Sequence, residues 1–314
     1  MTLYAFDGTW NENHDTGEYG LNTNVVMFAR AYGGTKRVVQ KSKTEDGPSV
    51  RDDFYTEGPG TRHGWFGKVI GGAFGIGGQD RIREATEALK QRFAEGDEVI
   101  DVIGFSRGAA LALHFCNAIA GLRLSHKNGE SRSPTVRFLG LWDVVAAFGI
   151  PIDLGPLKFH RVNLGYKLAL PENVTFCCHA IALDEQRKAF RVTRVENGYE
   201  VWFRGVHSDV GGGNQNEALS NIALAWMLRK AAFAGLPVDA TIAAQLAINA
   251  AAPIQPARVS IGGFRKLKIT DTMHYSVDQR SGHCQCGPPG CPVESVEQEQ
   301  SQLGTVTSLR ERRV

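Results

Sequence analysis

The sequence predicts an α/β protein whose mainly parallel sheet carries helices on both faces. Apolar runs of strand length alternate with amphipathic helical segments up to about residue 240, and such alternation is typical of parallel sheets. One apolar run, 99–103, ends in Gly-Phe-Ser-Arg-Gly at 104–108 and continues as a helix of small residues. In sheets of this kind the functional loops lie at the carboxyl ends of the strands.

Each element before this turn has a local signal. The expected order is strand 3–6, helix 22–32, a weak strand 53–55, a glycine-dense loop 64–78, helix 79–93 and strand 98–103. Asn22 or Thr23 can cap the first helix through a side-chain oxygen. The glycine density of the loop argues against helix, whereas apolar or small residues recur at helical spacing after it.

After the turn the alternation continues and then weakens. The expected elements are strands 136–142, 174–183 and 200–203, helix 216–234, an Ala-rich helix 239–252 and hairpin material at 259–269. Pro, Gly, Gln, Ser and charged residues dominate from 281, so we expect a polar, flexible tail over 281–314. This division leaves one catalytic domain over 1–280, with the apolar insertion 148–171 as a candidate cap over a pocket.

The bulk properties argue against several function classes. The 35 basic and 33 acidic residues nearly balance, and no basic stripe is interleaved with aromatic residues, so no nucleic acid partner is expected. The N-terminus lacks a signal-peptide pattern and no apolar run is long enough to span a bilayer, so we expect neither a Sec signal nor a membrane span. Six cysteines are few for a disulfide scaffold of this length and fit a reducing compartment such as the cytoplasm.

Ser106 is the candidate nucleophile. In a nucleophile elbow, a sharp strand-to-helix turn holds the serine with its hydroxyl exposed, and the residues two before and two after it must lack bulk. Gly104 and Gly108 meet this requirement, between a strand of buried type and a helix start at Ala109. The pattern predicts an α/β-hydrolase-like fold in which Ser106 is a covalent catalyst; the alternative is an ordinary tight turn.

A serine nucleophile needs a base and an orienting carboxylate, which on such sheets follow in the order Ser, Asp or Glu, His. His207 follows the strand 200–203 and precedes a Gly-Gly-Gly run, where an imidazole could reach the elbow. Asp143 ends its strand in an apolar setting, in which a carboxylate is costly unless paired. Asp184 and Asp209 compete for the acid role, but Asp209 is so near His207 in the chain that we expect it to brace the glycine loop.

Backbone amides near the elbow are candidates for an oxyanion hole. The amide of Arg107 directly follows the nucleophile, and the loop after the first strand offers Gly8 or Thr9 as the second donor. Asp7 borders the site in the same loop, whose alternative role is that of an ordinary turn. Calcium binding by Asp7 and Asp209 is a weaker alternative.

Four soft metal ligands lie within nine residues of the predicted tail: His283, Cys284, Cys286 and Cys291. Their number would suffice for a tetrahedral zinc site. Their spacing is not that of a recognised zinc finger, and one short loop rarely supplies all four ligands. We therefore expect a loose tail or, after export, a local disulfide, and no cofactor.

Five sequence blocks, taken together, resemble a known family. They are 6–11 (FDGTWN), 104–109 (GFSRGA), 139–145 (LGLWDVV), 179–187 (HAIALDEQR) and 202–213 (WFRGVHSDVGGG). In this order they resemble an α/β-hydrolase family of bacteria and fungi, long catalogued as a domain of unknown function, which includes type VI secretion phospholipase effectors. The resemblance covers most of the chain. It implies the triad Ser106, Asp143 and His207, a site bordered by Asp7, Gly8 and Thr9, and a structural polar cluster of Asp184, Glu185 and Arg187.

The expected activity is that of a serine hydrolase that cleaves carboxylic esters through an acyl-enzyme, in the manner of a lipase or phospholipase A. The alternatives are a carboxylesterase for small soluble or polymeric esters, and a binding module with an inactive hydrolase fold. Expected partners are an ester or lipid substrate and a membrane surface contacted peripherally. The resemblance adds a secretion machine or an immunity protein, and export without a signal peptide by a type VI machine after synthesis in the cytoplasm.

Overall fold

The computed structural model describes residues 1–8, 22–33, 54–56, 73–146, 167–214, 217–254, 263–280, 290–296 and 298. The strands are β1 (Thr2–Phe6), β2 (Phe54–Thr56), β3 (Val99–Phe105), β4 (Leu124–Ser125), β5 (Ser131–Arg132), β6 (Thr135–Trp142), β7 (Val174–Ala182), β8 (Tyr199–Phe203), β9 (Thr272–His274) and β10 (Val293–Glu294). The helices are α1 (Asn24–Ala31), α2 (Ala73–Ala94), α3 (Ser106–Ala120), α4 (His207–Gly211), α5 (Glu217–Phe233) and α6 (Ala240–Gln245). Two short 3₁₀ helices, η1 (Lys188–Phe190) and η2 (Tyr275–Val277), complete the described elements.

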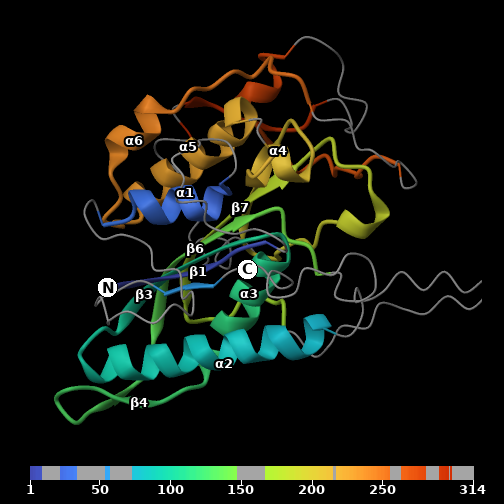
Figure 1. Ribbon diagram of the computed structural model, residues 1–314. Helices are drawn as coiled ribbons and strands as arrows, with labels where there is room; N and C mark the ends of the chain where they lie inside the picture. Colours follow the sequence, from blue (N-terminus) through green and yellow to red (C-terminus); the bar gives the residue numbers. More distant parts are fainter. Residues whose placement is uncertain are drawn as a thin grey trace, which may run out of the picture.

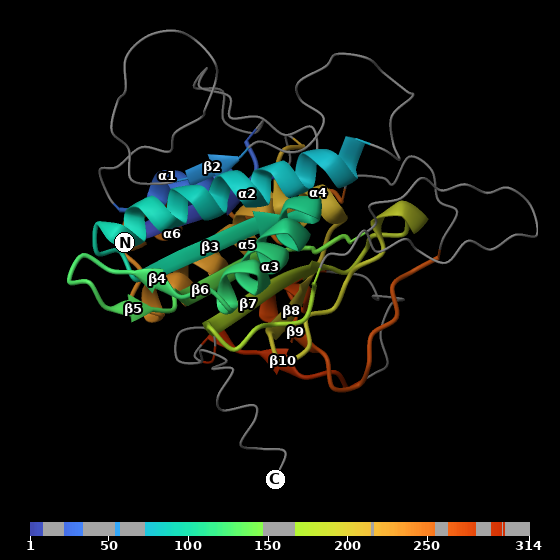
Figure 2. The same cartoon turned by 90° about the horizontal axis from the view of Figure 1, so that it is seen from below.

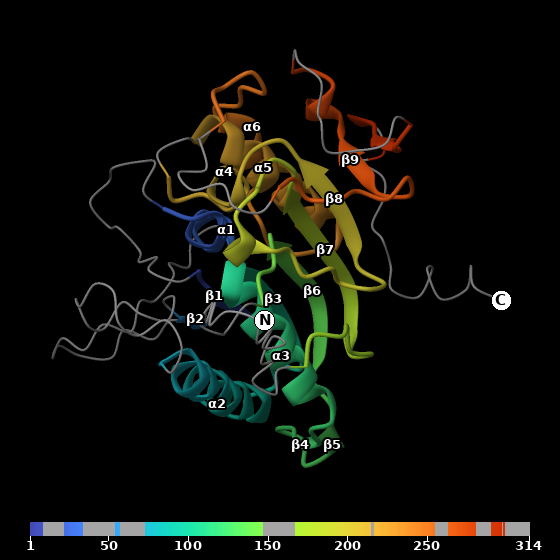
Figure 3. The ribbon, with the colours of Figure 1, turned by 90° about the vertical axis from the view of Figure 1, so that its right-hand side faces the viewer.

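Eight of the described strands form one sheet in the order β10-β9-β8-β7-β6-β3-β1-β2. Every neighbouring pair in it is parallel, and Figure 3 shows its central strands side by side. β4 and β5 form a separate antiparallel hairpin. The connection from β1 runs to β2 at one edge of the sheet, whereas the chain after β3 continues to β6 on the other side. The order therefore switches between β1 and β3, and the carboxyl edge at such a point is where open α/β sheets bind ligands.

Helices cover both faces of the sheet. Figure 1 shows α1, α5 and α6 on one side and α2 and α3 on the other, and Figure 2 shows the second layer from below. The alternation of side chains along β1 divides the core accordingly. Leu3 and Ala5 join the cluster with α1 and α5, whereas Tyr4 and Phe6 join the cluster with α2 and α3.

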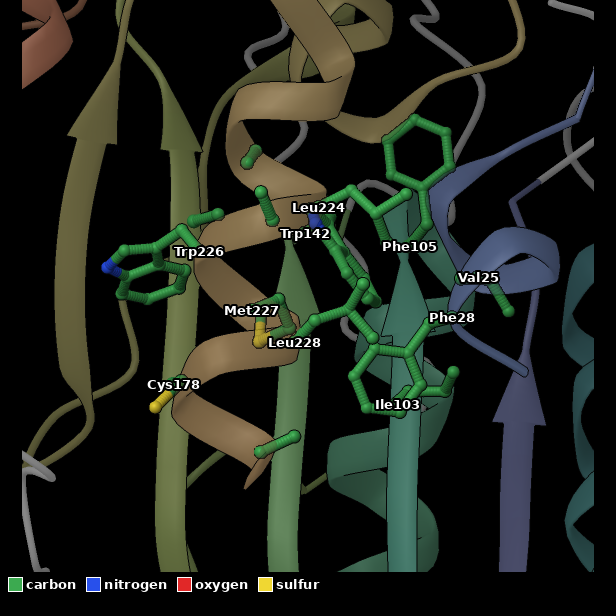
Figure 4. Packing of buried hydrophobic residues seen from close by; sticks show 14 of the residues in the cluster. Val25, Phe28, Ile103, Phe105, Trp142, Cys178, Leu224, Trp226, Met227 and Leu228 are labelled. Atoms are coloured by element: carbon green, nitrogen blue, oxygen red, sulfur yellow. The ribbon is translucent and has the colours of Figure 1, made fainter. Parts of the chain in front are cut away.

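The layer around α5 is the larger hydrophobic cluster. Phe28 of α1 packs edge to face against Trp142, with ring centroids 6.0 Å apart, and Figure 4 shows both rings beside Leu224 and Met227 of α5. α5 is buried along most of its length because α1, α4 and α6 contact it in addition to the sheet. This explains why its sequence is apolar on all sides.

The expected α/β architecture is confirmed, with two changes in helix length. α2 begins at Ala73, so the prediction of a non-helical loop up to residue 78 is wrong for 73–78. Extending a helix is easy once it is nucleated, and the strongly amphipathic segment 79–93 provides the nucleus. α6 ends at Gln245, short of the predicted 252, because the backbone beyond it bonds to α5: Asn221 Nδ2 donates to Ala247 O at 3.0 Å, and Asn249 N donates to Ala218 O at 3.2 Å.

The C-terminal part differs most from expectation. Within 263–269 the structure has no strand, and the rest of the predicted hairpin, at 259–262, lies outside the described residues. Val293–Glu294 forms β10 beside β9, so the prediction of a flexible tail is wrong there. Glu294 is buried and accepts hydrogen bonds from Tyr199 and Trp226 at 2.7 and 2.8 Å.

Two further expectations fall largely outside the described residues. Of the predicted cap at 148–171, only 167–171 is described. Of the predicted tail at 281–314, only 290–296 and 298 are described. Among the helices of the described segments, none combines the length and apolarity needed to cross a bilayer.

Candidate active site

Ser106 lies at the junction of β3 and α3, with a left-handed φ of 59°. A Cβ on Gly108 would come within 2.2 Å of the carbonyl oxygen of Phe6, and one on Gly104 within 2.7 Å of Ala109 Cα. The two glycines therefore allow α3 to start directly against β1. This is the geometry that a nucleophile elbow requires.

Asp143 and His207 meet at the same edge of the sheet. Asp143 follows β6 with φ 41°, His207 begins α4, and His207 Nδ1 lies 2.6 Å from Asp143 Oδ2. Both are buried. An ionised carboxylate only accepts hydrogen bonds, so Nδ1 carries the proton and Nε2 is left with its lone pair, as a general base requires.

The Asp143 carboxylate has a second partner, the charged side chain of Arg265, which the sequence interpretation does not include. Nη1 of Arg265 donates to Oδ1 at 2.6 Å and Nη2 to Oδ2 at 2.9 Å. The amide of Ala182 also donates to Oδ1, at 3.0 Å. Burial by itself would raise the pKa of Asp143, but the charge of Arg265 and the bond from His207 outweigh it and hold that pKa well below its usual range.

The imidazole of His207 lies between two aromatic rings. Its centroid is 4.6 Å from that of Phe105, the residue before Ser106, and 4.7 Å from that of Phe190. Burial lowers the pKa of His207, although Asp143 raises it. The ring is therefore neutral, and able to accept a proton, at pH 7.

Phe105, which directly precedes Ser106, brings the elbow next to His207 and α4. Gly211 of α4 packs so closely on this ring that a Cβ there would lie 1.9 Å from it. Within the described residues the Ser106 hydroxyl makes no hydrogen bond to His207. Catalytic hydrogen bonds are often long before substrate binds, so the transfer of a proton between the two residues belongs to the proposal below.

The competing carboxylates have other partners. Asp184 accepts hydrogen bonds from Arg204 Nε at 2.9 Å and from the amide of Gly205 at 2.7 Å. Asp209 accepts from the amide of Val206 at 3.0 Å and from Asn214 at 2.7 Å, which is the bracing role that its position predicts. Neither rival has a hydrogen bond to the His207 ring among the described contacts.

Glu185 fixes the backbone at His207. The amide of His207 donates to Glu185 Oε2 at 3.1 Å, and Arg187 forms an ion pair with the same carboxylate at 2.7 Å. The cluster of Asp184, Glu185 and Arg187 that the resemblance implies thus supports the segment that carries His207.

The predicted oxyanion donors differ in their surroundings. Arg107 is the second residue of α3, where backbone amides have no acceptor within the helix. The amide of Gly8 instead donates to Asp7 Oδ1 at 2.6 Å, and Asp7 Oδ2 accepts from Thr23 at 2.7 Å. Gly8 is therefore engaged by its neighbour in this structure, and Thr9 lies outside the described residues.

His179 supports the backbone after Asp143, a role that its place in a predicted strand does not reveal. Its Nε2 accepts from the amide of Val144 at 3.1 Å, and its Nδ1 lies 2.9 Å from Glu200 Oε1. Arg265 has no signal either: it lies within the predicted hairpin material at 259–269, and nothing in that pattern points to a partner for Asp143. Contacts between distant segments of the chain, and not local sequence, make these residues part of the site.

Only one of the four metal candidates lies in the part of the chain that the structure describes. Cys291 is buried, and its Sγ lies 3.5 Å from the carbonyl oxygen of Lys268; His283, Cys284 and Cys286 lie outside that part. No three potential ligands of one metal ion cluster there.

Comparisons with known proteins identify the family of this chain. The family model described as "T6SS, Phospholipase effector Tle1-like, catalytic domain" matches residues 3–128 and 120–230. The crystal structure of an uncharacterized protein from Pseudomonas aeruginosa is similar, with 23% identity, a TM-score of 0.52, and coverage of 79% of this chain and 48% of that one. This likeness supports the fold.

A second similar structure is that of the Tle1 effector bound to the VgrG spike from the Type 6 secretion system. It is 24% identical with a TM-score of 0.43, and the match covers 68% of this chain and 51% of the other. The chain thus spans about half the length of the solved structures it matches. The comparison with curated proteins gives no match.

Proposed function

This chain belongs to the family of Tle1-like catalytic domains of type VI secretion phospholipase effectors, and from that premise we propose that it is a serine hydrolase of the phospholipase A type. The single observation that carries the proposal is the bond of 2.6 Å between His207 Nδ1 and Asp143 Oδ2, formed beside the elbow that presents Ser106. The proposed substrates are carboxylic esters of phospholipids.

The first half of the proposed reaction acylates Ser106. Its Oγ attacks the ester carbonyl while its proton moves to His207 Nε2. The tetrahedral intermediate then collapses, the bond to the alcohol oxygen breaks, and that oxygen takes the proton from His207. The lysophospholipid leaves, and the fatty acyl group stays on Ser106.

Water completes the cycle. His207 takes a proton from water as the water oxygen attacks the acyl carbonyl, and the bond to Ser106 Oγ breaks as this proton returns to the serine. During both halves the transient imidazolium faces the ionised Asp143. No group beyond these residues and water is needed to balance the atoms and charges.

Backbone amides would stabilise the oxyanion. The position of the Arg107 amide at the start of α3 supports a role for it as one donor. The second donor would be Thr9, or Gly8 after release from Asp7. Each donor of this kind contributes roughly 2.7–4 kcal/mol to transition-state stabilisation in related enzymes.

Export through a type VI machine after cytoplasmic synthesis is part of the same proposal, and family membership supports it. Peripheral contact with a membrane, and an immunity protein as partner, stay predictions. Cleavage of lipid in vesicles would support peripheral contact with a membrane.

The test compares the wild type, Ser106→Ala and the control Ser125→Ala, which changes a serine in the exposed part of the β4 hairpin. We expect phosphatidylcholine vesicles to yield fatty acid and lysophospholipid with the wild type and the control, and nothing above background with Ser106→Ala. A fluorophosphonate probe should label only the two proteins that retain Ser106.

The other outcomes separate the alternatives. Ser106-dependent cleavage of short p-nitrophenyl esters without cleavage of vesicle lipid would establish a carboxylesterase and remove the lipid substrate. A folded wild type that the probe does not label would indicate a binding module with an inactive hydrolase fold.

A further inference from the structure

We propose that Arg265 is a positioning residue of this site, which holds the Asp143 carboxylate in the plane that His207 needs and balances the charge of the Asp143–His207 pair. The inference rests on the proposed function, because it assigns a role in the same reaction. It concerns a residue outside the Ser, His and Asp triad.

The contacts of Arg265 leave the carboxylate little freedom. Its two terminal nitrogens bind both oxygens of Asp143, at 2.6 and 2.9 Å. The same nitrogens donate to the carbonyl oxygens of Ala182, at 2.6 Å, and Phe190, at 2.5 Å. A planar guanidinium that is fixed at four points sets the plane of the carboxylate it binds, which a flexible ammonium cannot do.

This clamp also joins the segments on either side of the histidine. Phe190 contributes its ring to the surroundings of His207 and its carbonyl oxygen to Arg265. Ala182, at the end of β7, contributes its amide to Asp143 and its carbonyl oxygen to Arg265. Arg265 thus fixes Asp143 relative to the same two segments that surround the base.

The backbone that carries Arg265 is anchored independently of Asp143. Leu267 packs against a cluster that includes Trp202, and the amide of Lys268 donates to Asp271 at 2.8 Å. Asp271 in turn forms an ion pair with Arg194 at 2.7 Å. Contacts other than those with Asp143 therefore hold the segment that carries the guanidinium. Only 7% of the Arg265 side chain is exposed.

The charges around the pair show why Arg265 matters. Asp143 at the end of β6 contacts Arg265 and His207. From the segment after β7, Glu185 faces His207 with Arg187 bound to it.

The remaining charged groups nearby are paired or peripheral to the carboxylate. Asp184 is paired with Arg204, and Asp209 of α4 is bound to Val206 and Asn214. Arg265, in contrast, binds the Asp143 carboxylate directly through both terminal nitrogens.

The sign of its electrostatic effect follows from the total charge. With Arg265 present, ionised Asp143 and neutral His207 form a group of zero net charge, and binding a proton makes it positive. Without Arg265 the buried pair is negative, and one proton neutralises it. The apparent pKa of the pair must therefore rise when Arg265 is removed, whichever of the two residues holds the proton.

The experiment measures kcat/KM against pH for the wild type, Arg265→Gln and Arg265→Lys with a soluble ester. The matched control is Arg137→Gln, because Arg137 also binds both oxygens of a buried aspartate, Asp101, and a carbonyl oxygen, that of Gly235. Asp101 lies four residues before the end of β3, away from the elbow.

For Arg265→Gln we expect the acid limb of the kcat/KM profile to move to higher pH by about one unit or more. The plateau of kcat/KM should fall by about 10–100-fold, the size of loss seen when residues that orient metal ligands are removed. Arg265→Lys keeps the charge but not the fork, so its acid limb should stay near that of the wild type while kcat falls. Arg137→Gln should leave both limb and plateau unchanged.

A second readout needs no turnover. In the Ser106→Ala background, nuclear magnetic resonance of the histidine rings should show His207 binding its proton at higher pH once Arg265→Gln is added. This separates the two proposals: if the wild type has no Ser106-dependent activity, the proposed function fails, whereas the His207 titration still tests Arg265.

Three results would overturn the inference. They are an acid limb or His207 titration that is unchanged in folded Arg265→Gln, an equal shift in Arg137→Gln, and wild-type kcat in Arg265→Lys. If Arg265→Gln does not fold, Arg265→Lys decides the question through its kcat and its pH profile.

Discussion

At the scale of single residues, the site holds two residues in backbone conformations that most residues avoid. Ser106 and Asp143 have φ values of 59° and 41°, in the left-handed region that costs on the order of 1 kcal/mol or more for a residue with a Cβ. Both follow the last residue of a central strand. Such strain persists only where the surrounding structure holds it, here through the packing of α3 on β1 and the bonds to the Asp143 carboxylate.

The elbow makes a prediction about Gly108. In Gly108→Ala the new Cβ would lie 2.2 Å from the carbonyl oxygen of Phe6, so β1 and α3 must separate. We expect a loss of about 1–3 kcal/mol in the free energy of unfolding, measured by urea titration, and a lower kcat. The matched control is Gly121→Ala at the other end of α3, where a Cβ meets nothing within 4 Å. An equal loss in the control, or none in Gly108→Ala, would contradict the packing argument.

The sequence nominates Ser106, Asp143 and His207 because each follows a recognisable strand and their order along the chain suits a hydrolase sheet. Arg265 escapes such reasoning. It lies 122 residues from Asp143 in the chain, in a stretch whose only regularity is the alternation of buried Leu267 with exposed Lys266 and Lys268. A contact of that kind is set by the path of the chain in three dimensions, which no local pattern encodes.

At the scale of elements, β7 and β8 support, from within the sheet, the edge that carries Asp143 and His207. His179 lies opposite Glu200 in the register of these strands, and the imidazole bridges the Glu200 carboxylate and the amide of Val144. Arg194 holds the other oxygen of Glu200 at 2.5 Å. The loop that carries Asp143 is therefore fixed by β7 and β8 as well as by Arg265.

Replacing His179 should test this support. His179→Leu leaves the buried Val144 amide without its acceptor, which costs about 1–3 kcal/mol of stability, and should lower kcat because the Asp143 loop moves. The control is His126→Leu, which removes a histidine paired with Glu98 at 3.0 Å and packed edge to face on Phe93. It should also lower stability but leave kcat unchanged, because these contacts lie beside the β4 hairpin and not at the Asp143 loop. Both are measured by urea unfolding and ester hydrolysis. Full activity in His179→Leu would show that the loop does not need this bond.

Element by element, apolar runs predict the central strands, and a longer stretch of helix-forming residues predicts α5, to within one or two residues. The ends of α2 and α6 are less predictable, because they depend on how far a nucleated helix extends and on which backbone groups α5 binds. β9 and β10 are too short to show any pattern, and their strand character comes from pairing with β8 and with each other.

At the scale of the whole molecule, the last described strand closes one edge of the sheet through a buried ion pair. Lys230 of α5 and Glu294 of β10 are both buried, with Nζ 2.7 Å from Oε1. Lys230 also lies 5.0 Å from the centroid of the Tyr199 ring. This ion pair thus joins the edge of the sheet to the α5 layer. Either charge would strongly destabilise the fold if it were buried without the other.

Glu294→Gln should therefore destabilise the whole fold. It keeps the shape of the side chain but removes the negative charge that faces Lys230, and breaking a buried pair in this way costs about 3–5 kcal/mol. Asp80→Asn, which breaks an exposed pair with Arg83, should cost less than about 1 kcal/mol. Thermal unfolding at equal protein concentration measures both, and similar midpoints for the two variants would contradict a structural role for β10.

The ion pair at β10 also bears on how the protein is made. The ribosome delivers Lys230 well before Glu294, so during translation of the intervening residues the nascent α5 carries an ammonium whose carboxylate has not yet been synthesised. Domains usually fold as units once their sequence has emerged. Here the buried layer can settle only after Glu294 has been synthesised, so the order of synthesis sets the earliest moment at which this fold becomes stable.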